Sequence, residues 1–144
     1  MILAAAVVGA GLVGGVYAGF SAIVMPALGR LDDREATLAM VGINRSAERG
    51  PFILLFASAA AAAIGLAATA APRGDTTTMV VAGASLASTL VTVSVNVPLN
   101  RRLEREGPGF WVHYRRRWVA FNTLRAALAT TAVLVAGVDP LRIP

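Results

Sequence analysis

Long apolar stretches alternate with short polar segments along the chain, and four of these stretches contain at most one charged residue each. They cover about residues 1–25, 51–71, 79–99 and 118–138. A helix of roughly 20 residues crosses a hydrocarbon core of about 30 Å, and every stretch reaches that length. The pattern predicts an all-α fold, a four-helix transmembrane bundle forming a single integral membrane domain over residues 1–144.

The composition fits a lipid-embedded chain and excludes several soluble classes. The sequence is 56% hydrophobic with a mean hydropathy of +0.67, which is too apolar for a water-soluble domain of this size. It has no cysteine for a disulfide scaffold, and its one histidine is too few for a zinc, bis-histidine haem or copper site. No basic residue precedes Arg30, so the first stretch is predicted to be a retained span and not a cleaved leader.

A short amphipathic helix is predicted between the first and second spans, over about residues 33–48. Asp32 and Glu35 have the spacing of a capping box, with Asp32 as the N-cap. One apolar face then recurs at helical spacing through Ala36, Met40, Ile43 and Ala47. We expect this helix on the cytoplasmic side, lying along the membrane surface or capping the bundle.

The arginines are distributed unevenly among the polar segments. All 13 basic residues are Arg, which together with the Ala-rich composition is typical of a GC-rich bacterial genome. Ten lie in the first and third connections, whereas the opposite side carries only Arg73 and Arg142. The positive-inside rule predicts a multi-pass protein of the bacterial plasma membrane, with Arg-rich loops in the cytoplasm and both termini outside. Membrane orientation explains the arginines behind the net charge of +5 better than nucleic-acid binding does, so no nucleic-acid partner is predicted.

Small residues predict how the spans pack, because helices in lipid associate through close backbone approach. Gly11, Gly15 and Gly19 lie four residues apart on the first span, and the second span offers a matching small surface at residues 59–63. We expect these glycines to form the contact between the two spans, so that Gly15→Leu would weaken the bundle. The pattern leaves homo-oligomerisation open.

Polar residues form a stripe on each of the last two spans. The stripe on the third span comprises Ser85, Thr89, Thr92, Asn96 and Asn100, and that on the fourth comprises Trp111, Tyr114, Trp118, Asn122 and Arg125. Both sets have helical spacings of three or four, so we expect the stripes to face each other near the cytoplasmic end. They serve either as interhelical hydrogen bonds or as the lining of a ligand pocket.

The position of Arg125 favours the ligand pocket over interhelical hydrogen bonds alone. It lies seven residues beyond Trp118, about 10 Å along the helix, where a guanidinium costs about 2.5–3.5 kcal/mol or more. No span contains a carboxylate that could pair with the guanidinium. Its partner must therefore be an asparagine oxygen, a backbone carbonyl, a lipid phosphate, a ligand, or a loop acid such as Glu35 or Glu48. His113 is the only side chain that titrates near neutrality, but it lies about 140° from this stripe on the helix.

Four sequence pieces together carry a family resemblance. They are residues 17–28 (Tyr-Ala-Gly-Phe-Ser-Ala-Ile-Val-Met-Pro-Ala-Leu), Ile43-Asn44-Arg45, Asn96-Val97-Pro98-Leu99-Asn100, and the spaced set Trp111, Tyr114, Trp118, Asn122 and Arg125. In this order they resemble the anthrone oxygenase-like family of small four-helix membrane proteins. At one point the chain departs from the family pattern, with Phe121-Asn122-Thr123 where Trp-Asn-His is common.

The resemblance implies that the protein oxidises an anthrone-like polycyclic aromatic to a quinone with dioxygen and without a metal or other cofactor. Its candidate catalytic residues are then Arg125, Asn122, Asn96, Asn100 and His113. Its candidate substrate-binding residues are Tyr17, Asn44, Arg45, Tyr114 and Trp118. Arg125 would stabilise an oxyanion and the asparagines would orient substrate oxygens. No residue stands out as the general base.

Two other functions fit the sequence as well. One is a non-catalytic membrane subunit or scaffold, in which the polar stripes only hold helices together. The other is a small-molecule transporter, which would need a path through a bundle closely packed with Ala and Gly. The expected partners are the lipid bilayer and, for the oxygenase, a hydrophobic aromatic small molecule.

Overall fold

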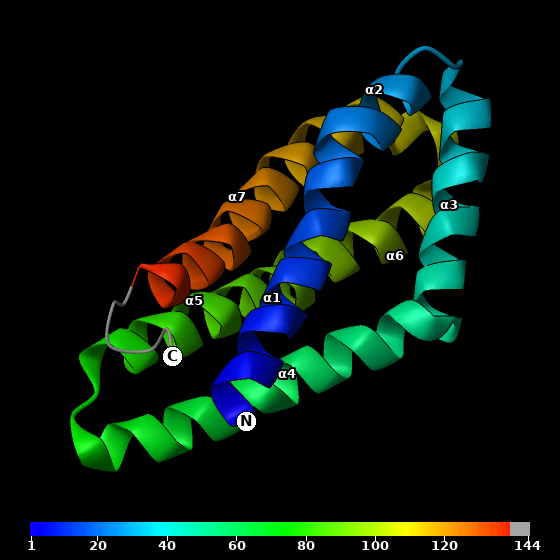
Figure 1. The fold of residues 1–144 in the computed structure, drawn as a ribbon. Coiled ribbons are helices and arrows are strands. Elements are labelled where there is room, and N and C mark those ends of the chain that lie inside the picture. The colour runs from blue at the N-terminus through cyan, green and yellow to red at the C-terminus, as the bar shows by residue number, and fades with distance from the viewer. Residues whose placement is uncertain (139–144) are drawn as a thin grey trace.

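The computed structural model describes residues 1–138, and every regular element in that range is helical. Arg142 lies outside the described residues. The long helices run side by side as an elongated bundle, and one helix lies across an end of it (Figure 1). The all-α prediction is confirmed for the described part of the chain.

The first half of the chain forms two long helical rods joined by the crossing helix. In chain order the elements are α1 (Ile2–Gly19), a π-helical turn (Phe20–Val24), α2 (Met25–Leu28), α3 (Asp33–Arg49), α4 (Pro51–Ala70) and a 3-10 turn (Ala71–Arg73). α4 begins at Pro51, whose fixed φ and missing N–H suit a first helical position. α1 packs against α4 and α7.

The second half is a helical hairpin. In chain order its elements are α5 (Thr76–Val91), a π-helical turn (Thr92–Asn96), α6 (Val97–Glu106), a 3-10 turn (Gly107–Phe110) and α7 (Trp111–Gly137). The chain reverses at Gly107, which has a φ of 70° that side-chain-bearing residues rarely adopt. α7 therefore packs back along α5 and brings the two polar stripes together.

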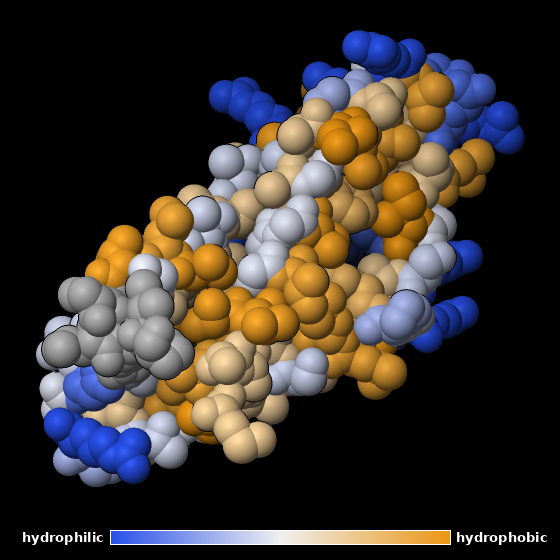
Figure 2. All heavy atoms as spheres, in the orientation of Figure 1, coloured by the Kyte–Doolittle hydropathy of each residue, from blue (hydrophilic) through white to orange (hydrophobic). Residues whose placement is uncertain are grey.

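Three continuous helical segments of the described chain are long and apolar enough to cross a membrane. They are Ile2–Leu28, Pro51–Arg73 and Thr76–Gly137. The last of these contains the whole hairpin and so includes both the third and the fourth predicted stretches. Side chains on the face shown in Figure 2 are hydrophilic at both ends of the bundle and over α3, and largely apolar between.

A helix is present over the predicted residues, as α3. The Asp32 carboxylate accepts a hydrogen bond from the backbone N–H of Glu35 at 2.8 Å, as the capping box requires. Ala36 and Met40 are fully buried, and they pack in one cluster with α2, α6 and the start of α7. α3 lies across one end of the bundle (Figure 1).

The predicted glycine contact is wrong. No atom of a neighbouring element lies within 4 Å of a Cβ added at Gly15 or Gly19. The close approaches are made instead by Gly9, where a Cβ would lie 2.9 Å from that of Ala59 in α4, and by Gly14, 2.9 Å from that of Ala129 in α7. Sequence spacing showed which glycines share a face, but it could not show that Gly15 and Gly19 meet no neighbour and that Gly11 lies near Val133 of α7 and not near α4.

Two prolines explain the π-helical turns. Pro26 and Pro98 each follow such a turn within two residues. A helical proline has no N–H to donate and its ring clashes with the carbonyl four residues earlier, which lies inside the turn in both cases. Widening that turn relieves the clash and re-aims the side chains around it. In the second case Thr92 and Asn96 are both buried on the face toward α7.

Candidate functional site

Arg125 lies in the middle of α7 with only 6% of its surface exposed. Its Nε and Nη2 donate to Asn122 Oδ1 at 3.0 and 2.7 Å, and its Nη1 donates to Thr92 Oγ1 at 3.1 Å. The guanidinium carbon lies 3.8 Å from the centre of the Tyr17 ring, so the cation also rests on an aromatic face. The ion pairs found among residues 1–138 do not include Arg125.

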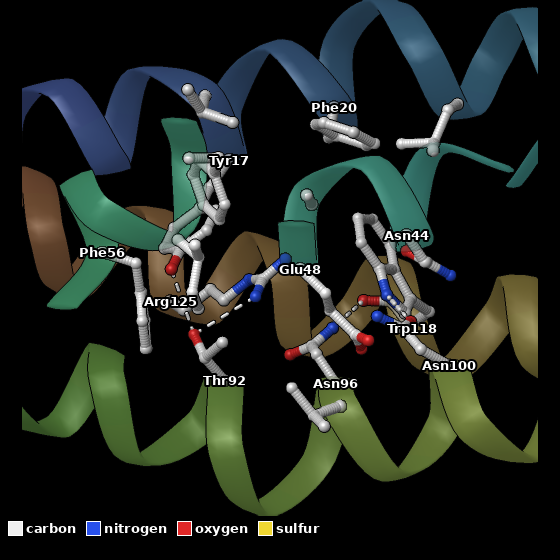
Figure 3. A pocket seen from close by; sticks show the side chains of 16 residues that line it. Tyr17, Phe20, Asn44, Glu48, Phe56, Thr92, Asn96, Asn100, Trp118 and Arg125 are labelled. Carbon is white, nitrogen blue, oxygen red and sulfur yellow. Dashed lines mark hydrogen bonds between the residues drawn. The ribbon is translucent and has the colours of Figure 1, made fainter. Parts of the chain in front are cut away.

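Asn122 and Thr92 are themselves held in place by α1. The Asn122 amide nitrogen donates to the Tyr17 carbonyl and to Ser21 Oγ, both at 2.7 Å, which turns the amide oxygen toward Arg125. Thr92 Oγ1 lies 3.1 Å from the Tyr17 hydroxyl. α1, α5 and α7 thus meet around the guanidinium (Figure 3).

Toward the α3 end of the bundle, two asparagines bind Trp118, one at its ring and one at its backbone. Asn100 Oδ1 accepts from the Tyr114 hydroxyl and from Trp118 Nε1, each at 2.9 Å. Asn96 Nδ2 donates to the Trp118 carbonyl at 3.3 Å. The two predicted stripes therefore do face each other. Ser85 and Thr89 are exceptions, because their hydroxyls bond back to the carbonyls of Val81 and Ser85 in their own helix.

A cavity of about 260 Å³ lies between these groups and the α3–α4 corner. Tyr17 and Phe20 of α1, Phe52 and Phe56 of α4, and Trp118 supply aromatic walls. Polar side chains reach it from α3, from α7, and from the continuous helical segment made of α5, its π-helical turn and α6, here called the α5–α6 rod (Figure 3). This volume is close to the lower end of the roughly 300–1,000 Å³ typical of small-molecule sites.

Two buried polar atoms in the cavity wall have no hydrogen-bond partner in the structure. They are Asn96 Oδ1, on a side chain only 1% exposed, and Asn44 Nδ2. A buried polar atom left unpaired costs about 1–3 kcal/mol, so such atoms are rare unless something else binds them. Asn96 Oδ1 therefore remains an unused acceptor, buried in the cavity wall.

Glu48 also lines the cavity, although sequence reasoning had considered it only as a partner for Arg125. It belongs to the last turn of α3, and its side chain points into the space between α3 and the α5–α6 rod (Figure 3). A usable signal was its position four residues after Asn44, which puts both on one helical face. The buried Ser88, which donates to the Arg125 carbonyl at 2.9 Å, was missed too.

Four predicted residues lie outside the cavity wall, and one of them, Asn122, meets the cavity only through its hydrogen bonds to Arg125. Arg45 is largely exposed and pairs with Glu104 in a neighbouring polar groove. His113 is exposed and stacks near the Phe110 ring, with 5.1 Å between ring centres. Tyr114 is buried behind Trp118 and reaches the cavity only through Asn100. The structure therefore does not bring His113 to the cavity, because this residue faces outward from α7.

The rim of the cavity is apolar on the side of α1 and α4. Val16 and Ile53 line it with 37% and 39% of their surfaces exposed. In the space-filling view a hollow opens between α1 and the α3–α4 corner, with hydrophilic atoms visible at its bottom (Figure 2). An apolar molecule can approach the buried polar groups from this side.

Fold and site together define an all-helical membrane protein with an apolar cavity around a buried arginine. The family model for anthrone oxygenase matches residues 44–135. The chain belongs to the anthrone oxygenase family, as the sequence resemblance predicted. Comparison with curated proteins and with solved structures gave no match. The matched region includes the polar cavity residues of α3, of the α5–α6 rod and of α7, whereas Tyr17 precedes it.

Proposed function

We propose that this protein is a cofactor-free oxygenase that converts an anthrone-like polycyclic aromatic ketone into a quinone. The observation that carries the proposal is a buried guanidinium on the wall of an apolar cavity, held by neutral partners alone. Family membership supports the same chemistry. An aromatic ketone fits this environment because its rings match the walls and its oxygen matches the cation.

The first step of this chemistry makes an oxyanion. Loss of a proton from a methylene flanked by two aromatic rings gives a carbanion whose charge spreads onto the ketone oxygen. Arg125 uses three of its five N–H groups on Asn122 and Thr92, which leaves two for that oxygen. A preorganised donor in a water-poor site stabilises such a charge strongly.

The second step uses dioxygen as the oxidant. Addition of O₂ to the carbanion forms a C–O bond and a peroxide, which takes up a proton. Loss of water then breaks the O–O bond and the remaining C–H bond and leaves a new carbonyl group. The substrate loses four electrons and O₂ gains them, so one oxygen atom stays in the quinone and the other leaves as water.

The membrane arrangement belongs to the same proposal. The segment Thr76–Gly137 reverses at residues 107–110, so we infer that it crosses the bilayer twice and that the chain has four spans. The α3 end of the bundle carries most of the arginines, which supports a cytoplasmic location for that end in a bacterial plasma membrane. Both termini would then lie outside.

Purified protein in detergent, given anthrone under ¹⁸O₂, tests the activity. We expect quinone to form faster than in protein-free micelles, with one ¹⁸O atom per quinone and one O₂ consumed per quinone formed. A rate equal to that of protein-free micelles would contradict the oxygenase and favour a non-catalytic membrane subunit.

A further inference from the structure

We propose that Glu48 is the general base of this reaction and that it returns the proton to water through the polar groove beside the cavity. The inference rests on the proposed function, because it supplies the base that the oxyanion mechanism needs. Neither the sequence motifs nor the family resemblance assigns this residue a catalytic role. Glu48 is the one carboxylate among the described residues that line the cavity (Figure 3).

The Glu48 carboxylate is not engaged by any described neighbour. The described residues give it no hydrogen bond and no ion pair, whereas Glu104 and Glu106 are held by Arg45 and Arg102. Arg125 lines the same cavity, but its hydrogen bonds go to the neutral side chains of Asn122 and Thr92 and not to Glu48. An unpaired carboxylate beside the apolar cavity is free to accept a proton from the methylene carbon of the substrate.

The groove gives the proton a way out. It has a volume of about 170 Å³, and its polar lining comprises Asn44, Arg45, Glu48, Asn100, Arg101 and Glu104. Asn44, Glu48 and Asn100 line both this groove and the cavity. Glu48 is exposed, and it lies at the boundary between the apolar cavity and the polar groove.

The step balances without a further reagent. The Glu48 carboxylate takes a proton from the substrate methylene, and the electron pair of that C–H bond moves through the ring system to the ketone oxygen facing Arg125. Glu48 is then a carboxylic acid, and it releases the proton to water in the groove. The enolate that remains is the species that reacts with O₂.

Because this step precedes the reaction with O₂, it can be measured alone. Anaerobic protein with anthrone in D₂O is expected to exchange the substrate methylene hydrogens faster than protein-free micelles, as followed by NMR. Glu48→Gln should slow this protein-dependent exchange, and aerobic quinone formation with it, by about 10²–10⁴-fold, the usual contribution of a general base. Glu35→Gln, at the other end of the same helix and able to keep the capping box, should match the wild type.

A second variant separates chemistry from structure. In Glu48→Ala the missing carboxylate leaves space, and added formate should restore part of the exchange rate in a concentration-dependent manner. A purely structural role for Glu48 would give no such rescue. Wild-type exchange and wild-type quinone formation by Glu48→Gln would overturn the assignment while leaving the oxygenase intact. Absence of quinone formation by the wild-type protein would instead overturn the oxygenase itself.

Discussion

At the scale of the residue, the site depends on how Arg125 is stabilised. A carboxylate partner would neutralise the guanidinium, but the structure surrounds it with the Asn122 oxygen, the Thr92 hydroxyl and the Tyr17 ring. Neutral partners offset the cost of burying the cation without cancelling its charge. The charge therefore remains available to a developing oxyanion.

Thr92 connects these partners, since its hydroxyl meets both Arg125 and Tyr17. Thr92→Val keeps the shape of the side chain but leaves a charged donor short of one acceptor. We expect a loss of about 1–3 kcal/mol of stability, typical of a buried donor left unpaired, and a lower rate of quinone formation. Thermal unfolding in detergent and the anthrone assay measure the two effects.

Thr89→Val is the matched control for that substitution. Thr89 lies on the same helical rod, and its hydroxyl bonds only to the Ser85 carbonyl of its own helix. The substitution Thr89→Val should therefore leave the rate of quinone formation unchanged. Equal effects of the two substitutions would show that the hydroxyl of Thr92 has no particular role in holding Arg125.

At the scale of the element, irregular helices position the site. The π-helical turn at Thr92–Asn96 places Thr92 beside Arg125 and Asn96 beside Trp118. The 3-10 turn at Gly107–Phe110 folds α7 back onto α5. α3 crosses the open end of the bundle and brings Asn44 and Glu48 to the cavity. The π-helical turn and α3 therefore bring together polar groups that a straight four-helix bundle would keep apart.

The contact between α1 and α7 is tight enough to test by substitution. A side chain at Gly14 would run into Ala129, so Gly14→Leu should force the two helices apart. Overpacking of this kind costs about 1–3 kcal/mol or more, and we expect a clearly lower melting temperature in detergent. Gly15→Leu, one residue away with open space around it, should melt close to the wild type. The reverse order of stabilities would contradict the observed packing.

At the scale of the whole molecule, charge is concentrated at one end. The connections near α3 and the α6–α7 turn hold ten arginines, and the α4–α5 connection at the other end holds Arg73. The cavity and its polar groove lie at the arginine-rich end. In the proposed orientation the groove opens toward the cytoplasm and the apolar rim toward the bilayer.

The chain lacks cysteine, so single cysteines report its orientation cleanly. We expect Arg73→Cys to react with a membrane-impermeant maleimide in intact cells. Arg105→Cys should react only after the cells are opened. The opposite pattern would invert the orientation, and reaction at both positions in intact cells would contradict four spans.

Much of this arrangement follows from sequence because its signals are local. The capping box fixed the start of α3, and regular spacing placed Asn122 and Arg125 on one face. What could not be predicted depends on direction in space. Gly15 and Gly19 of α1 face away from the other helices, and Ser88 and not Thr89 bonds to α7. Glu48 became a site residue only because α3 crosses the bundle.

The central claim is that the buried cation of Arg125 stabilises the oxyanion of the reaction. The most direct test compares kcat for anthrone oxidation in Arg125→Gln and in Arg73→Gln, which removes an exposed arginine at the far end of the bundle. We predict a kcat lower by about 10²–10³-fold for Arg125→Gln, the range seen when one oxyanion donor is lost, and an unchanged kcat for Arg73→Gln. A folded Arg125→Gln protein with the kcat of the wild type would contradict the account.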